Sequence, residues 1–259
     1  LRLPGVDGST RTPSGQPVVA VLDGLPVQNH PLLAGRLSID DPDGWESDYP
    51  ARDRVHGTAM TSLVLYGELD GSRVPLSRPI YVRPIMRPDP ADMSEPRQES
   101  TPDDVLLIDL VHRSVKRMFD GDAGSPAAAP TVKVVNLSVG DLLKPFDTEL
   151  SPWARLLDWL SSKYQVLFVV SAGNVSAQLT LPVPRGTLST LPVDARQRLA
   201  VPALVADSVG RRVLTPGESI NAITVGAVHA DGSTFVQTSD RFDLFPDHGI
   251  SPYSCIGHG

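Results

Sequence analysis

Two segments of the sequence carry residue types that can move a proton together. Asp23 ends the apolar run at residues 18–22, and His56 opens an amphipathic stretch. A carboxylate that accepts the ring N–H of a histidine fixes its tautomer and stabilises the imidazolium that forms when the ring takes up a proton. The two residues therefore match the acid and the base of a Ser-His-Asp triad. Each alone also has a plainer interpretation, as a turn aspartate and as a polar helix start.

A third segment, Ser171-Ala172-Gly173-Asn174, follows another apolar run. Its small residues leave room for a substrate side chain, and the Asn174 amide can donate a hydrogen bond to an oxyanion. The plainer alternative is a turn asparagine.

These side chains depend on the elements that position them. Short apolar runs without alternation, typical of strands buried on both faces of a parallel sheet, occur at 18–22, 80–85, 132–137, 166–170 and 220–228. Helical patterns occur between them at 57–66, 103–119 and 151–163. The alternation predicts an α/β fold with a doubly wound, mostly parallel sheet flanked by helices. Asp23 then lies at the carboxyl end of a strand, where such folds place their sites.

Local signals mark the starts of two of these helices. Ser151 is followed by Pro152, which is a cap before a proline at the first helical position. Asp103 and Asp104 begin the helix at 103–119, where negative charge suits the helix dipole.

Two segments interrupt the alternation. Residues 87–102 are polar and rich in proline, and predict a surface loop. Residues 175–218 form a long insertion, partly rich in Pro, Thr and Leu and partly helical around 194–212. Long insertions in compact domains are usually functional loops or partner surfaces. We expect a single incomplete domain over residues 1–259, with the insertion at 175–218 inside it.

Composition excludes several classes of function. The net charge of −7 disfavours nonspecific nucleic-acid binding, which needs clustered Lys and Arg. No apolar run has the length of a membrane-spanning helix, and the first residues form no signal peptide. The single Cys255 excludes an internal disulfide and fits a cytoplasmic protein slightly better than a secreted one.

An acidic run at residues 40–48 invites a calcium interpretation, because Ca²⁺ prefers clustered oxygen ligands. Its spacing fits no loop motif, so a solvated acidic loop is favoured. We therefore predict no cofactor and no metal, with calcium as the alternative.

The order and spacing of these segments resemble the subtilisin-like serine proteases, or subtilases (peptidase family S8). His30-Pro31 stands seven residues after Asp23, and His56-Gly57-Thr58 matches the family's His-Gly-Thr. Further similar segments are Asn136 to Gly140, Ser171 to Asn174, Ile223 to Ala227 and Ser251 to Gly257. The resemblance implies a subtilisin-like three-layer α/β/α fold and hydrolysis of peptide bonds in an extended peptide or protein substrate.

The resemblance also implies roles for individual residues. Asp23 would orient His56, His56 would act as the base, and Asn174 would donate to the oxyanion. Ser138, Val139 and Gly140 would hold the substrate as an added strand. Ser171, Ala172 and Gly173 would line its side-chain pocket. The parent protein would have no nucleic-acid or membrane partner, whereas the insertion leaves room for a regulatory domain or partner.

The chain departs from the family pattern in three places. Gly24-Leu25 stands where the family usually has Ser or Thr and then Gly. Ala59 stands where a second histidine is common, and Asp141 replaces a usual Gly or Ser. These differences indicate a divergent bacterial-type member.

The third member of the triad is not recognisable in these 259 residues. The family places its serine in Gly-Thr-Ser, and no Gly-Thr-Ser occurs here. We expect the serine beyond Gly259, which would make this piece inactive by itself. The first alternative is a pseudoprotease that binds peptides or a partner through the surviving groove. The second is an unrelated doubly wound domain, which the separation of Asp23 and His56 distinguishes.

Overall fold

The computed structural model describes residues 12–67, 74–175, 177–229 and 242–257, which form two compact units. The first unit comprises residues 1–139, 155–170 and 220–223, and the second comprises residues 140–154, 171–219 and 224–259. Each unit has its own apolar core. The predicted single domain over residues 1–259 stays a prediction, and its ends at 1–11 and 258–259 lie outside the described residues.

A six-stranded sheet has the order β10-β8-β6-β1-β3-β2. Its strands are β1 (Val19–Asp23), β2 (Leu37–Ile39), β3 (Ile80–Pro84), β6 (Val134–Leu137), β8 (Leu167–Ser171) and β10 (Ala222–Val225). β1 pairs in parallel with both β3 and β6, and the pairs β2–β3 and β6–β8 are parallel too. The strand order reverses at β1, which confirms the predicted doubly wound sheet.

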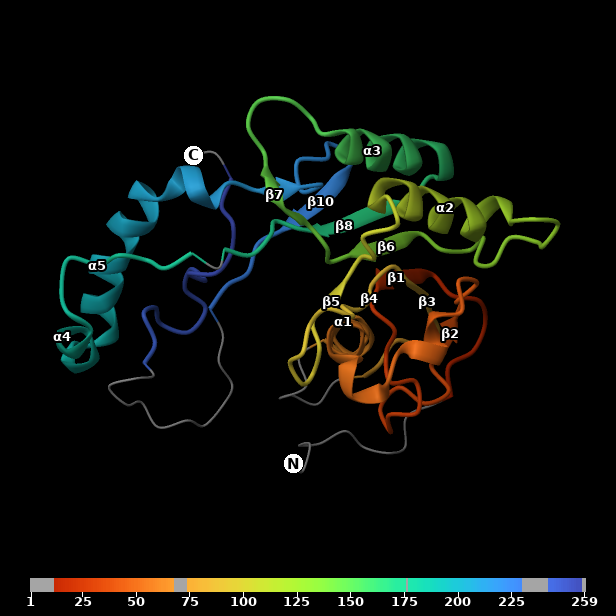
Figure 1. Ribbon diagram of the computed structural model, residues 1–259, viewed down its shortest axis with the longest axis horizontal. Coiled ribbons are helices and arrows are strands. Elements are labelled where there is room, and N and C mark those ends of the chain that lie inside the picture. The colour runs from red at the N-terminus through yellow and green to blue at the C-terminus, as the bar shows by residue number, and fades with distance from the viewer. Residues whose placement is uncertain (1–11, 68–73, 176, 230–241, 258–259) are drawn as a thin grey trace. The chain divides into compact units, whose positions relative to one another are not determined.

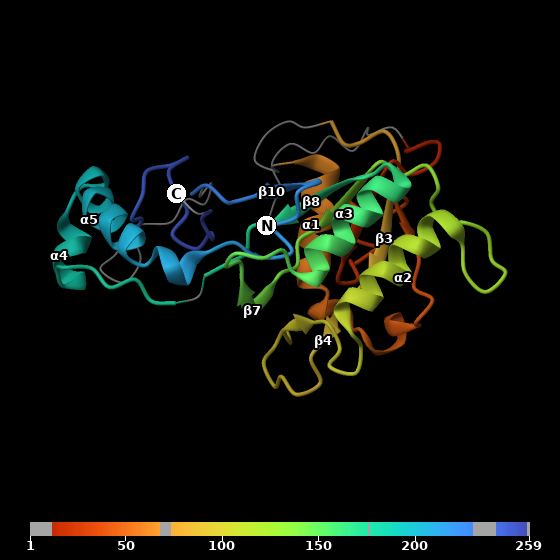
Figure 2. The same ribbon diagram turned by 90° about the horizontal axis from the view of Figure 1, so that it is seen from above.

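Helices cover both faces of this sheet. They are α1 (Val55–Tyr66), α2 (Leu107–Asp120) and α3 (Pro152–Tyr164). α2 and α3 lie side by side on one face and α1 lies on the other (Figures 1 and 2). The α2–α3 contact includes Phe119 stacked on Tyr164, with ring centroids 4.7 Å apart. The layers are therefore the predicted α/β/α arrangement.

Burial explains why β1 reads as an unbroken apolar run. Ala20, Val21 and Leu22 have no exposed surface, because helices cover both faces of the sheet. Val21 packs in one apolar cluster with Leu65 of α1 and Ile80 of β3. This packing fixes the end of β1, where Asp23 stands.

The first turn of α1 lies directly against the residue that follows β1. A Cβ added at Gly57 would lie 2.1 Å from the carbonyl oxygen of Gly24. Only a glycine permits this backbone contact. The contact places His56, the neighbour of Gly57, beside the end of β1.

Two helix starts were predicted from local signals, with different outcomes. The N–H of Ala154 donates to the Ser151 hydroxyl at 3.0 Å, which confirms the predicted cap of α3. α2 begins at Leu107 instead of at residue 103, because Leu106 has extended backbone angles (φ −71°, ψ 112°). Asp103 and Asp104 therefore precede the helix.

The predicted surface loop at 87–102 contains regular structure. Its two short strands, β4 (Arg87–Pro88) and β5 (Glu99–Ser100), pair antiparallel as a hairpin. Arg97 of this hairpin binds Asp53, which ends the 3₁₀ helix η2 (Ala51–Asp53) just before α1. A second 3₁₀ helix, η1 (Trp45–Asp48), lies earlier in the same segment.

The second unit holds the whole insertion at 175–218. Its elements are β7 (Asp141–Pro145), α4 (Arg185–Thr190), α5 (Val193–Ala206), the 3₁₀ helix η3 (Ser208–Arg211) and β9 (Leu214–Thr215). α5 and η3 confirm the predicted helical part, whereas α4 was not predicted. β7 and β9 pair antiparallel.

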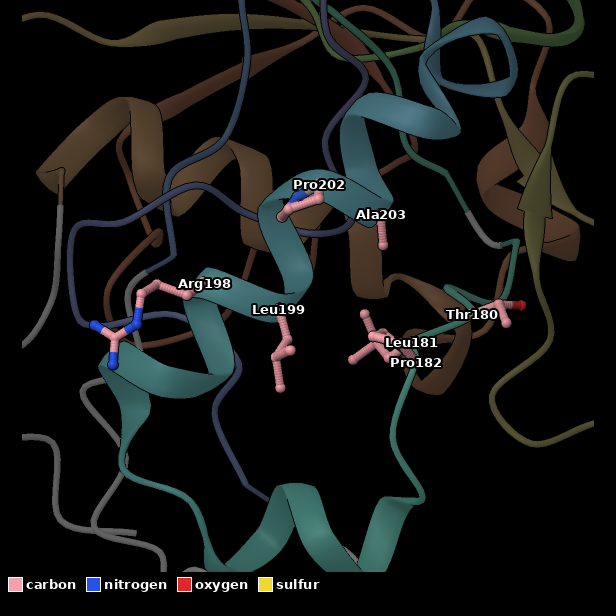
Figure 3. Close-up of a pocket in the computed structure, with 7 residues that line it drawn as sticks. All are labelled: Thr180, Leu181, Pro182, Arg198, Leu199, Pro202 and Ala203. Carbon is pink, nitrogen blue, oxygen red and sulfur yellow. The ribbon is translucent and has the colours of Figure 1, made fainter.

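An open hollow of about 450 Å³ lies between α5 and the segment before α4 (Figure 3). It is lined by Thr180, Leu181, Pro182, Arg198, Leu199, Pro202 and Ala203. Next to it, Ala200 and Leu204 pack on Phe245 in a small core. No helix within the described ranges is both long and apolar enough to cross a bilayer.

The close approach of α1 to β1 predicts the effect of Gly57→Ala. The new methyl group would lie 2.1 Å from a backbone oxygen, so the helix must move away from β1. We expect the free energy of unfolding to fall by about 1–3 kcal/mol, the usual cost of overpacking. Chemical denaturation measures it.

The matched control is Gly186→Ala in α4, where no atom lies within 4 Å of the added Cβ. We expect this variant to lose no stability and to gain up to about 1 kcal/mol, since alanine favours a helix. Equal stability of the two variants would contradict the contact.

Candidate active site

The structure brings Asp23 and His56 into direct contact. Asp23 is the last residue of β1 and is fully buried, and His56 is the second residue of α1. Nδ1 of His56 lies 2.6 Å from Oδ1 of Asp23, and the same oxygen accepts the Gly24 N–H at 2.7 Å. The pair is thus within the hydrogen-bond reach that an acid–base pair needs.

This contact sets the protonation of the histidine. The hydrogen bond to Asp23 raises the pKa of His56 above its ordinary value of 6.5. Partial burial opposes the shift, whereas the negative charges of Asp23 and Glu99 add to it. The side chain is still 45% exposed, so a substrate can reach the ring. Asp23 does not bind the second ring nitrogen, Nε2.

The residues around the pair explain the His-Gly-Thr motif. Gly57 touches Gly24, and the hydroxyl of Thr58 accepts the Val27 N–H at 2.9 Å. Both contacts join the first turn of α1 to the chain that leaves β1. His30 lies in the following turn, where its carbonyl accepts the backbone N–H of the residues three and four positions later.

The predicted substrate-binding segment begins where β6 ends. Ser138 and Val139 are half-buried, and the Ser138 hydroxyl donates to the side-chain oxygen of Asn136 at 3.2 Å. Because β6 lies parallel to β1, both strands end at the same edge of the sheet. Gly140 belongs to the second unit, where Asp141 begins β7.

The segment Ser171 to Asn174 continues from the end of β8 in the second unit, where Asn174 pairs with Ser254 in an isolated β-bridge. The Gly173 N–H donates to the Ser171 hydroxyl at 3.0 Å, and Gly173 has a φ of 103°, which favours glycine. The Ala172 carbonyl accepts the Leu214 N–H at 2.9 Å. Asn174 is exposed, as an oxyanion donor must be.

Leu214 is a neighbour that the sequence did not identify. A Cβ added at Gly173 would lie 2.5 Å from its Cγ, so the Leu214 side chain fills the space beside this glycine. Leu214 packs in one apolar cluster with Ala172, Val175 and Cys255. The small size of Gly173 therefore accommodates a side chain of the protein itself.

The acidic run at 40–48 is tied to arginines instead of being only solvated. Asp40 binds Arg117 at 2.9 Å and Tyr81 at 2.5 Å, and Asp43 binds the buried Arg83. Burial opposes ionisation of Asp40, but these hydrogen bonds outweigh it and lower the pKa of Asp40. Among the residues described, no group of three or more His, Cys, Asp or Glu side chains has a metal-binding arrangement.

Glu99 is the charged residue at the site that the sequence did not single out. Its Oε2 accepts the backbone N–H of His56 at 2.5 Å, and its Oε1 accepts the hydroxyl of Tyr49. Glu99 lies in β5, inside the segment expected to be a surface loop. The one sequence signal that pointed to Glu99 was Gly24, which stands where the family usually has a Ser or Thr side chain.

The raised pKa of His56 predicts the effect of Asp23→Asn. Removing the charge takes away the Coulombic attraction of Asp23 and leaves only a weaker, neutral hydrogen bond, so we expect the pKa of His56 to fall. NMR titration of the His56 ring measures it, with the exposed Asp103→Asn as a control. An unchanged pKa in Asp23→Asn would refute the electrostatic role of the pair.

The same shift has a consequence for stability. A raised folded-state pKa stabilises the fold fully below the unfolded value of about 6.5, and this stabilisation is lost as the pH rises through the raised pKa. The stability advantage of the wild type over Asp23→Asn should therefore shrink across that window.

Comparisons with known proteins identify the family of the chain. The sequence model of the subtilase family, Peptidase_S8, matches residues 14–252. Curated protein sequences give no significant match.

Several solved protease structures are similar to the chain. The prenylagaramide maturation protease PagA is 18% identical, with 90% of this chain and 61% of that chain covered and a TM-score of 0.42. MycP1 with its N-terminal propeptide removed is 16% identical, with 95% of this chain and 62% of that chain covered and a TM-score of 0.43. The MycP3 protease from the type VII (ESX-3) secretion system is 18% identical, with 90% of this chain and 63% of that chain covered and a TM-score of 0.42. The chain spans about three fifths of the length of these structures. Because the family model covers nearly the whole sequence, the chain belongs to the subtilase family.

Proposed function

We propose that the chain is part of a serine endopeptidase that hydrolyses peptide bonds with an Asp-His-Ser triad. The hydrogen bond between Asp23 and His56, in a chain of the subtilase family, is the observation that carries this proposal. The buried carboxylate binds Nδ1 of the ring, and Nε2 is left to exchange a proton with a nucleophile.

The proposed reaction follows from these roles. His56 takes the proton of the serine hydroxyl as the serine oxygen bonds to the substrate carbonyl carbon. It then gives that proton to the leaving amine as the C–N bond breaks, and water releases the acyl group by the reverse sequence. Asn174 donates to the oxyanion of the tetrahedral intermediate together with the serine N–H.

The substrate in this proposal is an extended peptide or a segment of a protein. Ser138, Val139 and Gly140 hold it as an added strand by main-chain hydrogen bonds. Ser171, Ala172 and Gly173 are the predicted residues of its side-chain pocket, and Leu214 packs beside Gly173 at this position. The mechanism requires no cofactor.

The nucleophile is the remaining part of the proposal. These 259 residues contain no Gly-Thr-Ser, whereas the order Asp, His, Asn of the family is preserved. We place the serine in the parent protein after Gly259, so that the 259-residue chain alone hydrolyses nothing. The competing function is a pseudoprotease, which would bind peptides at residues 138–140 without cleaving them.

Hydrolysis by the parent protein tests this proposal. We expect it to cleave a fluorogenic peptide library, and we expect His56→Ala to lower kcat about 10²- to 10⁴-fold, because the general base is lost. The exposed His248→Ala serves as the control and should leave kcat unchanged. Peptide binding without cleavage by the parent would favour the pseudoprotease. Cleavage by the 259-residue chain would place the nucleophile within it.

A second variant tests the oxyanion role of Asn174. We expect Asn174→Ala to lower kcat of the parent protein about 10²- to 10³-fold with little change in KM, because the lost bond forms mainly in the transition state. Asn221→Ala is the control, since the Asn221 side chain binds the Asp158 carbonyl on α3. An unchanged kcat in Asn174→Ala would remove the residue from the mechanism.

A further inference from the structure

A second carboxylate stands at the first turn of α1. Oε2 of Glu99 accepts the His56 backbone N–H at 2.5 Å, and Glu99 lies 43 positions away in the sequence. The first N–H groups of a helix have no partner inside the helix, and a negative charge there also suits the helix dipole. Arg54, which precedes α1, contributes no side-chain hydrogen bond as a cap. Glu99 therefore caps the N-terminus of α1 from a distant part of the sequence.

The unusual Gly24 makes room for this carboxylate. A Cβ at Gly24 would lie 2.1 Å from Oε1 of Glu99 and 2.5 Å from the Tyr49 hydroxyl. A serine or threonine at this position, as in most of the family, would displace both side chains. The departure from the family pattern at Gly24 and the presence of Glu99 thus belong to one local arrangement.

The hairpin that carries Glu99 is itself held in place. Asp53 has no exposed surface, and it accepts the Arg97 backbone N–H at 3.1 Å and the Arg97 side chain at 2.8 Å. Despite the burial, these bonds lower the pKa of Asp53. Asp53 lies two residues before α1, so the same ion pair ties the hairpin to the start of the helix.

We propose that Glu99 is a positioning residue for His56. It holds the first turn of α1 by the His56 N–H, and its charge is a second negative charge beside the ring that Asp23 binds. The role rests on the proposed function, because it matters for catalysis only if His56 is the base.

The titratable and charged groups near His56 come from β1, from β5 and from the segment between η1 and α1. Asp23 ends β1 and Glu99 lies in β5, and both favour the imidazolium form. Tyr49, between η1 and η2, is a neutral donor, because burial and the Glu99 carboxylate raise its pKa. Arg54 is turned toward the Tyr49 carbonyl at 2.7 Å and toward Glu46.

NMR on the 259-residue chain tests the role without any substrate or nucleophile. The readouts are the pKa of the His56 ring and the hydrogen exchange of its backbone amide. Glu99→Gln removes the charge but keeps an oxygen that can accept the N–H, whereas Glu99→Ala removes both. The control is Glu95→Gln on the same hairpin, whose side chain is 76% exposed and pairs with Arg52.

We expect both Glu99 variants to lower the pKa of His56 by about 0.5 unit or more, as the loss of a nearby charge does. Only Glu99→Ala should speed exchange of the His56 amide, by about tenfold, because that variant alone has no side-chain oxygen left to accept the N–H. Glu95→Gln should change neither quantity. A pKa unchanged in Glu99→Gln, or an amide equally protected in Glu99→Ala, would overturn the proposal.

A measurement on the wild-type chain avoids the question of whether the variants fold. The carboxyl ¹³C signal of Glu99 should shift at the pH at which His56 titrates. A Glu99 chemical shift that stays constant across that pH range would overturn the proposal. Neither result bears on hydrolysis, so failure here is distinguishable from failure of the peptidase assignment.

Discussion

The site depends on one backbone contact, in which the first turn of α1 lies against the residue that follows β1. The strand is fixed by burial on both faces, and Gly57 lets the helix approach the Gly24 carbonyl more closely than a residue with a Cβ could. The Thr58 hydroxyl then holds Val27 to the same turn. With strand and helix joined in this way, the neighbouring side chains Asp23 and His56 meet at 2.6 Å. A wider separation would leave a fully buried carboxylate without its partner, which is costly.

The electrostatics of the site follow from this geometry. A buried carboxylate binds a ring that is half exposed, so the imidazolium is stabilised on one side while the other stays open to a substrate. Glu99 reaches the same turn of α1 from a hairpin and uses the space that Gly24 leaves. The departure from the family pattern at Gly24 is thus coupled to Glu99, and it leaves the Asp–His pair intact.

The sequence allowed the prediction of those parts that rest on local pattern. The buried strand before Asp23, the helix at His56 and the order of the family motifs are all visible in short segments. The role of Glu99 could not be predicted, because its partner His56 is 43 positions away in the sequence. The sequence around Glu99 is also polar, rich in proline and without periodicity. The three-residue strand β2 is too short to produce a pattern. Leu214 was missed for a similar reason, because only the folded chain shows that it fills the space beside Gly173.

The central claim is that Asp23 binds the Nδ1 proton of His56 and leaves Nε2 free as the base. The ring ¹⁵N chemical shifts of His56, recorded above its pKa, test this most directly, since they distinguish the two neutral tautomers. We predict that the neutral ring carries its proton on Nδ1 and that Nε2 is unprotonated. A neutral ring with its proton on Nε2 would contradict it.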